Sequence, residues 1–263
     1  MRKLLFFFIF FSFFYISGSF LAYADLLITK TTVLKDELDF DGIWTHPNEW
    51  KPTSQTKIET ENGSIFLRYA HQEDFVYFLI DVVADKNPEK HVDKATICID
   101  TKNDKTVLPN ENDYCFIAVL GKEQGHTIQG GSFVSTQNYY KKIQNHNDFI
   151  AIGNASNEND RYSKIPHSTY EFRIPTDVIT RSNIYGIYVG IFDKSQSITY
   201  SWPETTSHYT KIPSPSSWGN LVSPDKSLPE FNIPFFSIII GFTIIMLYFQ
   251  VKSRFLNNQI LKF

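Results

Sequence analysis

The chain has 263 residues, a formal net charge of −3 and an aromatic content of 16%. Residues 25–228 include 20 basic and 27 acidic residues, a net charge of about −7, and no run of Lys or Arg. An acidic surface repels the phosphate backbone, which argues against nucleic acid as a partner. A stretch of this length suits one domain of ordinary size.

The first 24 residues have the pattern of a secretory signal peptide. Arg2 and Lys3 precede an uncharged, mostly apolar run that ends in Ala22-Tyr23-Ala24. A basic start, an apolar block and an Ala-x-Ala ending predict cleavage before residue 25, and the alternative is an uncleaved signal anchor. In either case we expect the chain to be exported, with residues 25–37 as the N-terminal leader of the mature chain.

Eight segments of the body combine apolar–polar alternation with β-branched and aromatic residues, which is typical of strands. Turn-rich stretches separate these segments, and only residues 175–182 predict a short helix. Many short strands with almost no helix predict an all-β fold, an antiparallel β-sandwich or jelly roll over residues 38–222. The eight segments are 64–70, 75–85, 95–100, 114–121, 148–155, 168–175, 184–193 and 198–202.

The two cysteines, Cys98 and Cys115, lie in neighbouring predicted strands on either side of the polar loop 101–113. In an antiparallel hairpin they fall opposite or nearly opposite each other. Outside the cell such a pair can form a cross-strand disulfide, and the alternative is two buried free thiols. Two N-x-S sequons, at Asn62 and Asn154, lie in predicted loops and are candidate glycosylation sites.

Carboxylates gather at predicted strand ends and in loops. Ca²⁺ takes about six to eight oxygen ligands, so these groups predict a structural calcium site, with solvated acidic loops as the alternative. Seven histidines are scattered without metal-ligand spacing, and we expect them to be solvated loop residues. Because the motifs of zinc proteases, serine hydrolases and phosphate-binding loops are missing from the sequence, we expect no enzyme. The candidate calcium ligands are Asp39, Asp41, Asp81 and Asp85.

A second apolar run is uncharged from Phe231 to Val251. These 21 residues reach about 30 Å as a helix, the thickness of the hydrocarbon core of a bilayer. The run is too long and too uniformly apolar for a helix buried in a small domain. We therefore expect a transmembrane helix over residues 233–251. The basic tail 252–263 then faces the cytoplasm, and the body lies on the extracellular side of the cytoplasmic membrane.

The triplet Pro229-Glu230-Phe231 stands directly before this helix, at the end of a Ser/Pro-rich stalk over residues 223–232. A Pro-Glu-Phe triplet, an apolar helix and a short basic tail together resemble the archaeal PEF-type C-terminal sorting signal. The resemblance implies a membrane sorting enzyme that cuts near the triplet and replaces the helix with another anchor. Simple retention of the helix is the alternative.

The order of several short motifs in the body resembles the family 9 carbohydrate-binding module and the wider dopamine-monooxygenase-like (DOMON) sandwich group. The resemblance covers residues 38–222 and implies a β-sandwich that binds carbohydrate. It also implies that Trp50 packs into the sandwich and that Trp218 closes the core. The motifs are Asp41-Gly42, Glu49-Trp50, the Tyr-x3-Asp-Val-x2-Asp pattern of residues 77–85, Ile99-Asp100, Tyr170-Glu171-Phe172-Arg173-Ile174-Pro175 and Trp218-Gly219.

Two tryptophans, Trp44 and Trp202, remain as candidates for stacking on a sugar ring, with core packing as the alternative for each. The leading hypothesis is a non-catalytic glycan-binding module displayed at the cell surface. The DOMON resemblance offers a haem-binding electron-transfer domain instead, but Met1 and Met246 lie outside the sandwich, which leaves only a pair of histidines as axial ligands. A structural envelope protein without a ligand is the third hypothesis.

Overall fold

The computed structural model describes residues 26–28, 30–31, 38–46, 48–133, 139–204 and 211–223. All of them belong to one compact unit, residues 1–225. Within these ranges no helix is both long enough and apolar enough to cross a membrane. The expected signal peptide, PEF triplet, membrane helix and basic tail lie outside the described residues and stay predictions.

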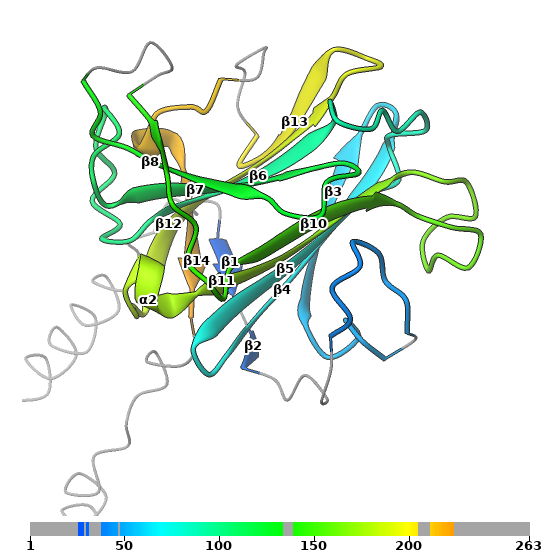
Figure 1. Ribbon diagram of the computed structural model, residues 1–263, viewed down its shortest axis with the longest axis horizontal. Coiled ribbons are helices and arrows are strands. Elements are labelled where there is room, and N and C mark those ends of the chain that lie inside the picture. Colours follow the sequence, from blue (N-terminus) through cyan, green and yellow to red (C-terminus); the bar gives the residue numbers. More distant parts are fainter. Residues whose placement is uncertain are drawn as a thin grey trace, which may run out of the picture. The chain divides into compact units, whose positions relative to one another are not determined.

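The described residues form two layered β-sheets, seen together in Figure 1. Sheet A contains β1 (Leu26–Ile28), β6 (Lys94–Asp100), β7 (Asp113–Val119), β8 (His126–Gln129), β9 (Lys141–Ile143), β12 (Ile184–Asp193), β13 (Ile198–Trp202) and β14 (Gly219–Val222). The strand order is β1-β14-β12-β6-β7-β8-β9, and β13 pairs with β12 beside β14.

Sheet B contains β2 (Lys30–Thr31), β3 (Ser54–Thr60), β4 (Gly63–Gln72), β5 (Phe75–Val82), β10 (Ile150–Ala155) and β11 (Ser168–Pro175). Its order is β10-β11-β5-β4-β2, and β3 pairs with β4 beside β2. The strand pairs are antiparallel except β1 with β14 and β2 with β4. The expected antiparallel β-sandwich is therefore confirmed.

All eight predicted strand segments are strands, namely β4, β5, β6, β7, β10, β11, β12 and β13. The predicted short helix is also present, as α2 (Thr176–Ile179), and a single 3₁₀ turn, η1 (Pro215–Ser217), precedes β14. The sequence patterns missed six strands. These are short or polar segments, most of them near the edges of the sheets, where pairing with a neighbour rather than side-chain alternation determines the conformation.

The sandwich begins earlier in the sequence than expected. The predicted leader of residues 25–37 contributes β1 to sheet A and β2 to sheet B. This segment therefore passes from one layer to the other, pairing in parallel with β14 and then with β4.

The main core lies between the two sheets. Because side chains alternate along a strand, Val76, Phe78, Ile80 and Val82 of β5 point into this core, whereas Leu79 points away from it. The same alternation directs the even-numbered aromatic residues of β11 and the odd-numbered apolar residues of β12 inward. The sequence pattern thus determines which face of each central strand is buried between the layers.

The face of sheet A turned away from the core is covered by a small cluster that we call cover A: Cys98, Cys115, Tyr140, Tyr188 and Trp218. Cys98 pairs with Cys115 across β6 and β7, with 4.0 Å between their Cα atoms. The two residues form a disulfide, as predicted.

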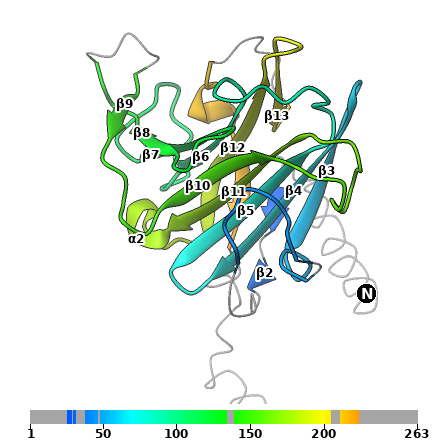
Figure 2. The ribbon, with the colours of Figure 1, turned by 45° about the vertical axis from the view of Figure 1, so that its right-hand side comes forward.

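The opposite face of sheet B carries a second cluster, which we call cover B: Trp44, Trp50 and Leu79, with the partly buried Leu38, Tyr77 and Tyr162. Figure 2 shows its chain segment, residues 38–46 and 48–53, lying in blue across β4 and β5. Gly42 has a φ of +88°, and a Cβ atom there would lie 2.9 Å from Asn154. A residue without a Cβ is therefore required for this segment to approach β10.

Candidate functional site

Trp44 is buried rather than open to solvent. Its side chain belongs to cover B and only 7% of the residue is exposed. The guanidinium carbons of Arg68 and Arg161 lie 4.7 and 4.8 Å from the centre of its ring, and its indole N–H donates to the His46 carbonyl oxygen. A buried ring that contacts two guanidinium groups leaves little open face for a sugar, so the expected stacking role of Trp44 stays a prediction.

Trp202 is half-buried at the end of β13 and packs against the main core. It is not among the residues that line the two clefts described below, so its expected role in stacking stays a prediction. Trp50 is fully buried and Trp218 is 4% exposed, as the resemblance implied. Trp218, however, closes cover A and not the main core.

A cleft of about 420 Å³, which we call the main cleft, lies where β7, β8, the β9–β10 connection and α2 meet. Figure 1 shows β7, β8 and α2 at the same side of the sandwich. Its floor is the aromatic pair Phe116 and Phe149, whose ring centres are 5.2 Å apart. The other lining residues are Tyr114, Thr127, Ile143, Gln144, Asn145, His146, Asp177 and Val178.

Hydrogen bonds hold the walls of the main cleft in place. Asn145 accepts from the Thr127 backbone N–H at 2.9 Å and donates to the Gly125 carbonyl oxygen at 2.9 Å, which fixes the β9–β10 connection against β8. The Tyr114 hydroxyl accepts from the Gln129 amide at 3.0 Å. The cleft therefore presents one phenol ring, amides, an imidazole and the exposed carboxylate of Asp177 on a supported frame.

A second cleft of about 350 Å³ lies between the loop that carries Phe40 and Asp41 and the end of β10. The Asp41 carboxylate already accepts from the Ile43 backbone N–H and the Thr45 hydroxyl. Asn154, also in its lining, donates to the Asp41 carbonyl oxygen at 3.2 Å. Asp41 and Asn154 are thus engaged in internal hydrogen bonds, and among the described residues that line this cleft no aromatic pair like that of the main cleft forms the floor. We therefore regard the main cleft as the better binding site.

The two sequons lie in different settings. Asn62 is exposed in the turn between β3 and β4, as expected for a loop. Asn154 is also exposed but lies within β10, which corrects the expectation of a loop. Glycosylation of either residue stays a prediction.

The four predicted calcium ligands do not meet. Asp39 is exposed, and Asp85 lies near Asp93 and Asp193 at the turn after β5. Within the described part of the chain, the one group of three metal-ligating side chains contains Asp81 but none of the other three. The expected four are therefore not brought together as one group of side chains, and a calcium site stays a prediction. Strand alternation directs Asp81 to the outer face of sheet B, away from the turn that holds Asp85.

His71 and His167 are buried at 1% exposure each, which corrects the expectation that the histidines are solvated. The His71 ring contacts the Ser223 hydroxyl and the Glu73 carbonyl oxygen, one through each nitrogen. His167 likewise uses both nitrogens. Neither can ligate haem iron without losing these contacts. A signal for their burial was present in the sequence, since His71 continues one predicted strand and His167 directly precedes another.

Two solved structures resemble the fold. Both are a family 9 carbohydrate-binding module from Caldicellulosiruptor kristjanssonii, one in complex with cellotriose and one with glucose. Each is 12% identical with a TM-score of 0.44, and the alignments cover 75% of this chain and 92% and 95% of those chains. No protein-family model and no curated protein matches the chain.

Proposed function

We propose that the chain is a non-catalytic glycan-binding module whose sugar site is the main cleft. The cleft itself carries the proposal. Its volume of about 420 Å³ lies within the range of about 300–1,000 Å³ that is usual for small-molecule sites. Its lining joins an aromatic ring to amide and carboxylate groups, which is the combination that a pyranose requires.

Each part of the lining has a distinct role in this proposal. The Tyr114 ring stacks on the C–H face of the sugar, because that face is apolar and the ring is flat. At the rim, the Gln144 amide donates to or accepts from the hydroxyl groups of the sugar, and the Asp177 carboxylate accepts from them. Asn145 supports the wall through its hydrogen bonds to Thr127 of β8 and to Gly125 just before that strand.

The proposed setting is the outer face of the cytoplasmic membrane. The Cys98–Cys115 disulfide supports it, because disulfides persist in oxidising compartments. The predicted signal peptide and C-terminal helix complete the proposal, with the helix either retained or exchanged by a sorting enzyme. The partner is then a glycan or cell-surface polysaccharide.

The test is binding of the purified full-length chain in detergent to a broad glycan array, followed by calorimetry on the best ligand. We expect Tyr114→Ala to weaken binding about tenfold or more, because an aromatic anchor contributes about 2 kcal/mol. Phe192→Ala is the matched control, since Phe192 is a half-buried aromatic residue on β12 outside the main cleft. We expect it to bind like the wild type.

Two outcomes contradict the proposal. If the folded wild type binds no glycan, the module has no sugar site and the structural hypothesis replaces it. If Trp202→Ala abolishes binding while Tyr114→Ala leaves it unchanged, a sugar site exists but not in the main cleft.

A further inference from the structure

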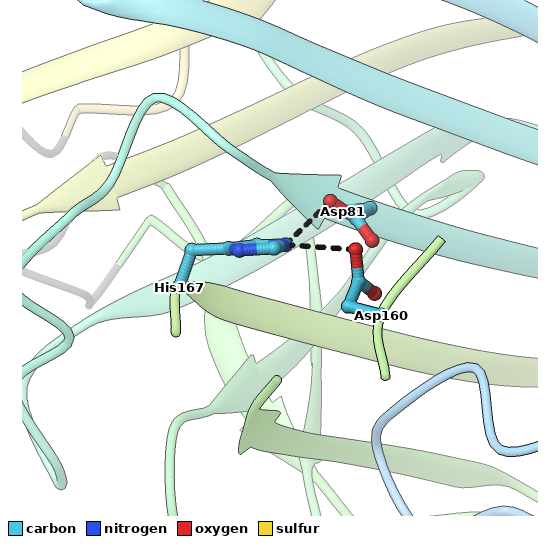
Figure 3. A group of neighbouring side chains, drawn as sticks. All are labelled: Asp81, Asp160 and His167. Carbon is cyan, nitrogen blue, oxygen red and sulfur yellow. Dashed lines mark hydrogen bonds and ion pairs between the residues drawn. The ribbon is translucent and has the colours of Figure 1, made fainter. Parts of the chain in front are cut away.

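Three buried side chains converge beyond the outer face of sheet B and share no residue with the main cleft. Asp81 comes from β5, Asp160 from the β10–β11 connection, and His167 directly precedes β11. Their side chains are only 0%, 2% and 1% exposed, respectively. Figure 3 shows the imidazole ring pointing at both carboxyl groups, which lie next to each other.

The spacing of the donor atoms suits a small divalent cation. His167 Nε2 lies 2.8 Å from Asp81 Oδ1 and 3.7 Å from Asp160 Oδ1, and one ligand atom from each residue lies within 4.8 Å of the others. Bonds of about 2.0–2.2 Å in a tetrahedron place neighbouring donors about 3.3 Å apart. An ion can therefore enter between them with small side-chain movements.

Nε2 of His167 faces the two carboxylates. The hydrogen bond on the other side of the ring, at Nδ1, determines whether this Nε2 carries a proton or a lone pair. Nδ1 lies 2.7 Å from the Ile165 carbonyl oxygen, which can only accept, so Nδ1 carries a proton. In the neutral ring Nε2 is then an acceptor that faces two further acceptors. Either a proton on Nε2 or a cation removes this conflict, and a backbone carbonyl behind the ring is the usual outer partner of a metal-ligating histidine.

An unpartnered atom points independently to a missing ligand. Asp81 Oδ2 is buried and has no hydrogen-bond partner, and leaving a buried carboxylate oxygen unpaired is costly. It is available as a further donor, which would make Asp81 a bidentate ligand. Asp160 Oδ1 is held in place by the backbone N–H groups of Tyr162 and Ser163, at 2.7 and 3.0 Å.

We propose that Asp81, Asp160 and His167 bind a divalent first-row transition ion, Zn²⁺ being the best fit, as a structural centre that fixes the β10–β11 connection to sheet B. An imidazole nitrogen among carboxylate oxygens favours such an ion over Ca²⁺, which prefers oxygen alone. Because the ligands are almost completely buried, the site holds the fold together and leaves no open position for a substrate.

The test begins with the wild type and needs no variant. Full-length chain purified without a metal-binding tag or chelator is analysed by elemental mass spectrometry. We expect about one zinc per chain. After removal of the metal with a chelator, we expect Zn²⁺ to raise the Tm by several °C and Ca²⁺ to leave it unchanged, because an ion that binds only the folded state stabilises it.

Variants then assign the ion to these residues. We expect His167→Gln and Asp160→Asn to lose the zinc and the Zn²⁺-dependent rise in Tm, whereas His146→Gln, a control outside the cluster, keeps both. Negligible metal in the wild type together with no response of the apo protein to Zn²⁺ would overturn the proposal and leave the cluster as a protonated His167 paired with carboxylates. A response to Ca²⁺ instead of Zn²⁺ would overturn the choice of ion.

Discussion

The two outer covers of the sandwich close their sheet faces by different means. Cover A contains the Cys98–Cys115 disulfide, and its other members are aromatic residues. One of them, Trp218, donates from its indole N–H to the Pro213 carbonyl oxygen at 3.1 Å. Cover B depends on buried charged groups around its tryptophans. The comparison shows that a sheet face can be closed either by a covalent link or by a network of matched polar partners.

Glu171 is central to the network in cover B. Its carboxylate accepts from the Trp50 indole N–H at 2.8 Å and from the Gly42 backbone N–H at 2.8 Å. Burial raises the pKa of Glu171 well above its usual value, and these two hydrogen bonds offset part of that rise. Arg68, also buried, donates to the Tyr162 hydroxyl at 2.7 Å and to the Trp50 carbonyl oxygen at 3.0 Å. Loss of one partner in such a network leaves a buried polar group unpaired.

The largest effect is expected at the centre of cover B. Trp50→Ala removes a fully buried indole and should lower the free energy of unfolding by about 3–5 kcal/mol, the usual cost of such a cavity. Chemical denaturation followed by circular dichroism measures this loss. Trp50→Phe is the control that keeps most of the volume but removes one of the two hydrogen-bond donors to Glu171, since the Gly42 backbone N–H remains. A loss below 1 kcal/mol for Trp50→Ala would show that cover B contributes little to stability.

The next effect concerns the covalent link of cover A. The double variant Cys98→Ala/Cys115→Ala releases a cross-link between residues 17 positions apart. A closed loop of this size contributes about 3 kcal/mol by restricting the unfolded chain. Denaturation with and without a reductant measures the contribution, because the reductant should destabilise the wild type and leave the double variant unchanged. If the wild type without reductant is no more stable than the double variant, the disulfide does not stabilise the fold.

The smallest expected effect is a pH dependence at the polar edge of cover A. Burial, and then the neighbouring carboxylates of Asp100 and Asp104, raise the pKa of Asp113 to about 7. The folded state therefore binds the proton of the Asp113 carboxyl group more tightly than the unfolded state does. The stability that this protonation contributes is complete below about pH 4 and is lost as the pH rises through about 7.

Asp113→Asn removes this titration while keeping an acceptor for the Asn110 backbone N–H. At pH 8 we expect the variant to be more stable than the wild type by about 1 kcal/mol, a value reduced for solvent screening. Thermal unfolding of both proteins from pH 5 to pH 8 measures the difference, which should shrink toward pH 5. If the difference in stability between the variant and the wild type does not change with pH, it arises from packing and not from the titration of Asp113.

Local patterns predicted eight of the strands and the disulfide. Alternation along a strand is a property of neighbouring residues, so the eight predicted segments and their inward faces follow from the sequence alone. The pairing of Cys98 with Cys115 follows from the symmetry of one hairpin around its loop. Of the six strands that were missed, β1, β2 and β14 acquire their conformation from partners distant in the chain.

The candidate sites, in contrast, were decided by the tertiary structure. The local sequence around Trp44 does not distinguish an exposed ring from a buried one. Its burial depends on distant residues that pack against it, among them Arg68, Arg161 and Tyr162. The main cleft joins residues from Tyr114 to Val178, and the Asp81–His167 contact joins residues 86 positions apart. A sequence therefore specifies the period and the buried face of each strand, because these depend on neighbours in the chain. Which polar groups meet depends on how the layers and loops come together, and only the folded chain determines that.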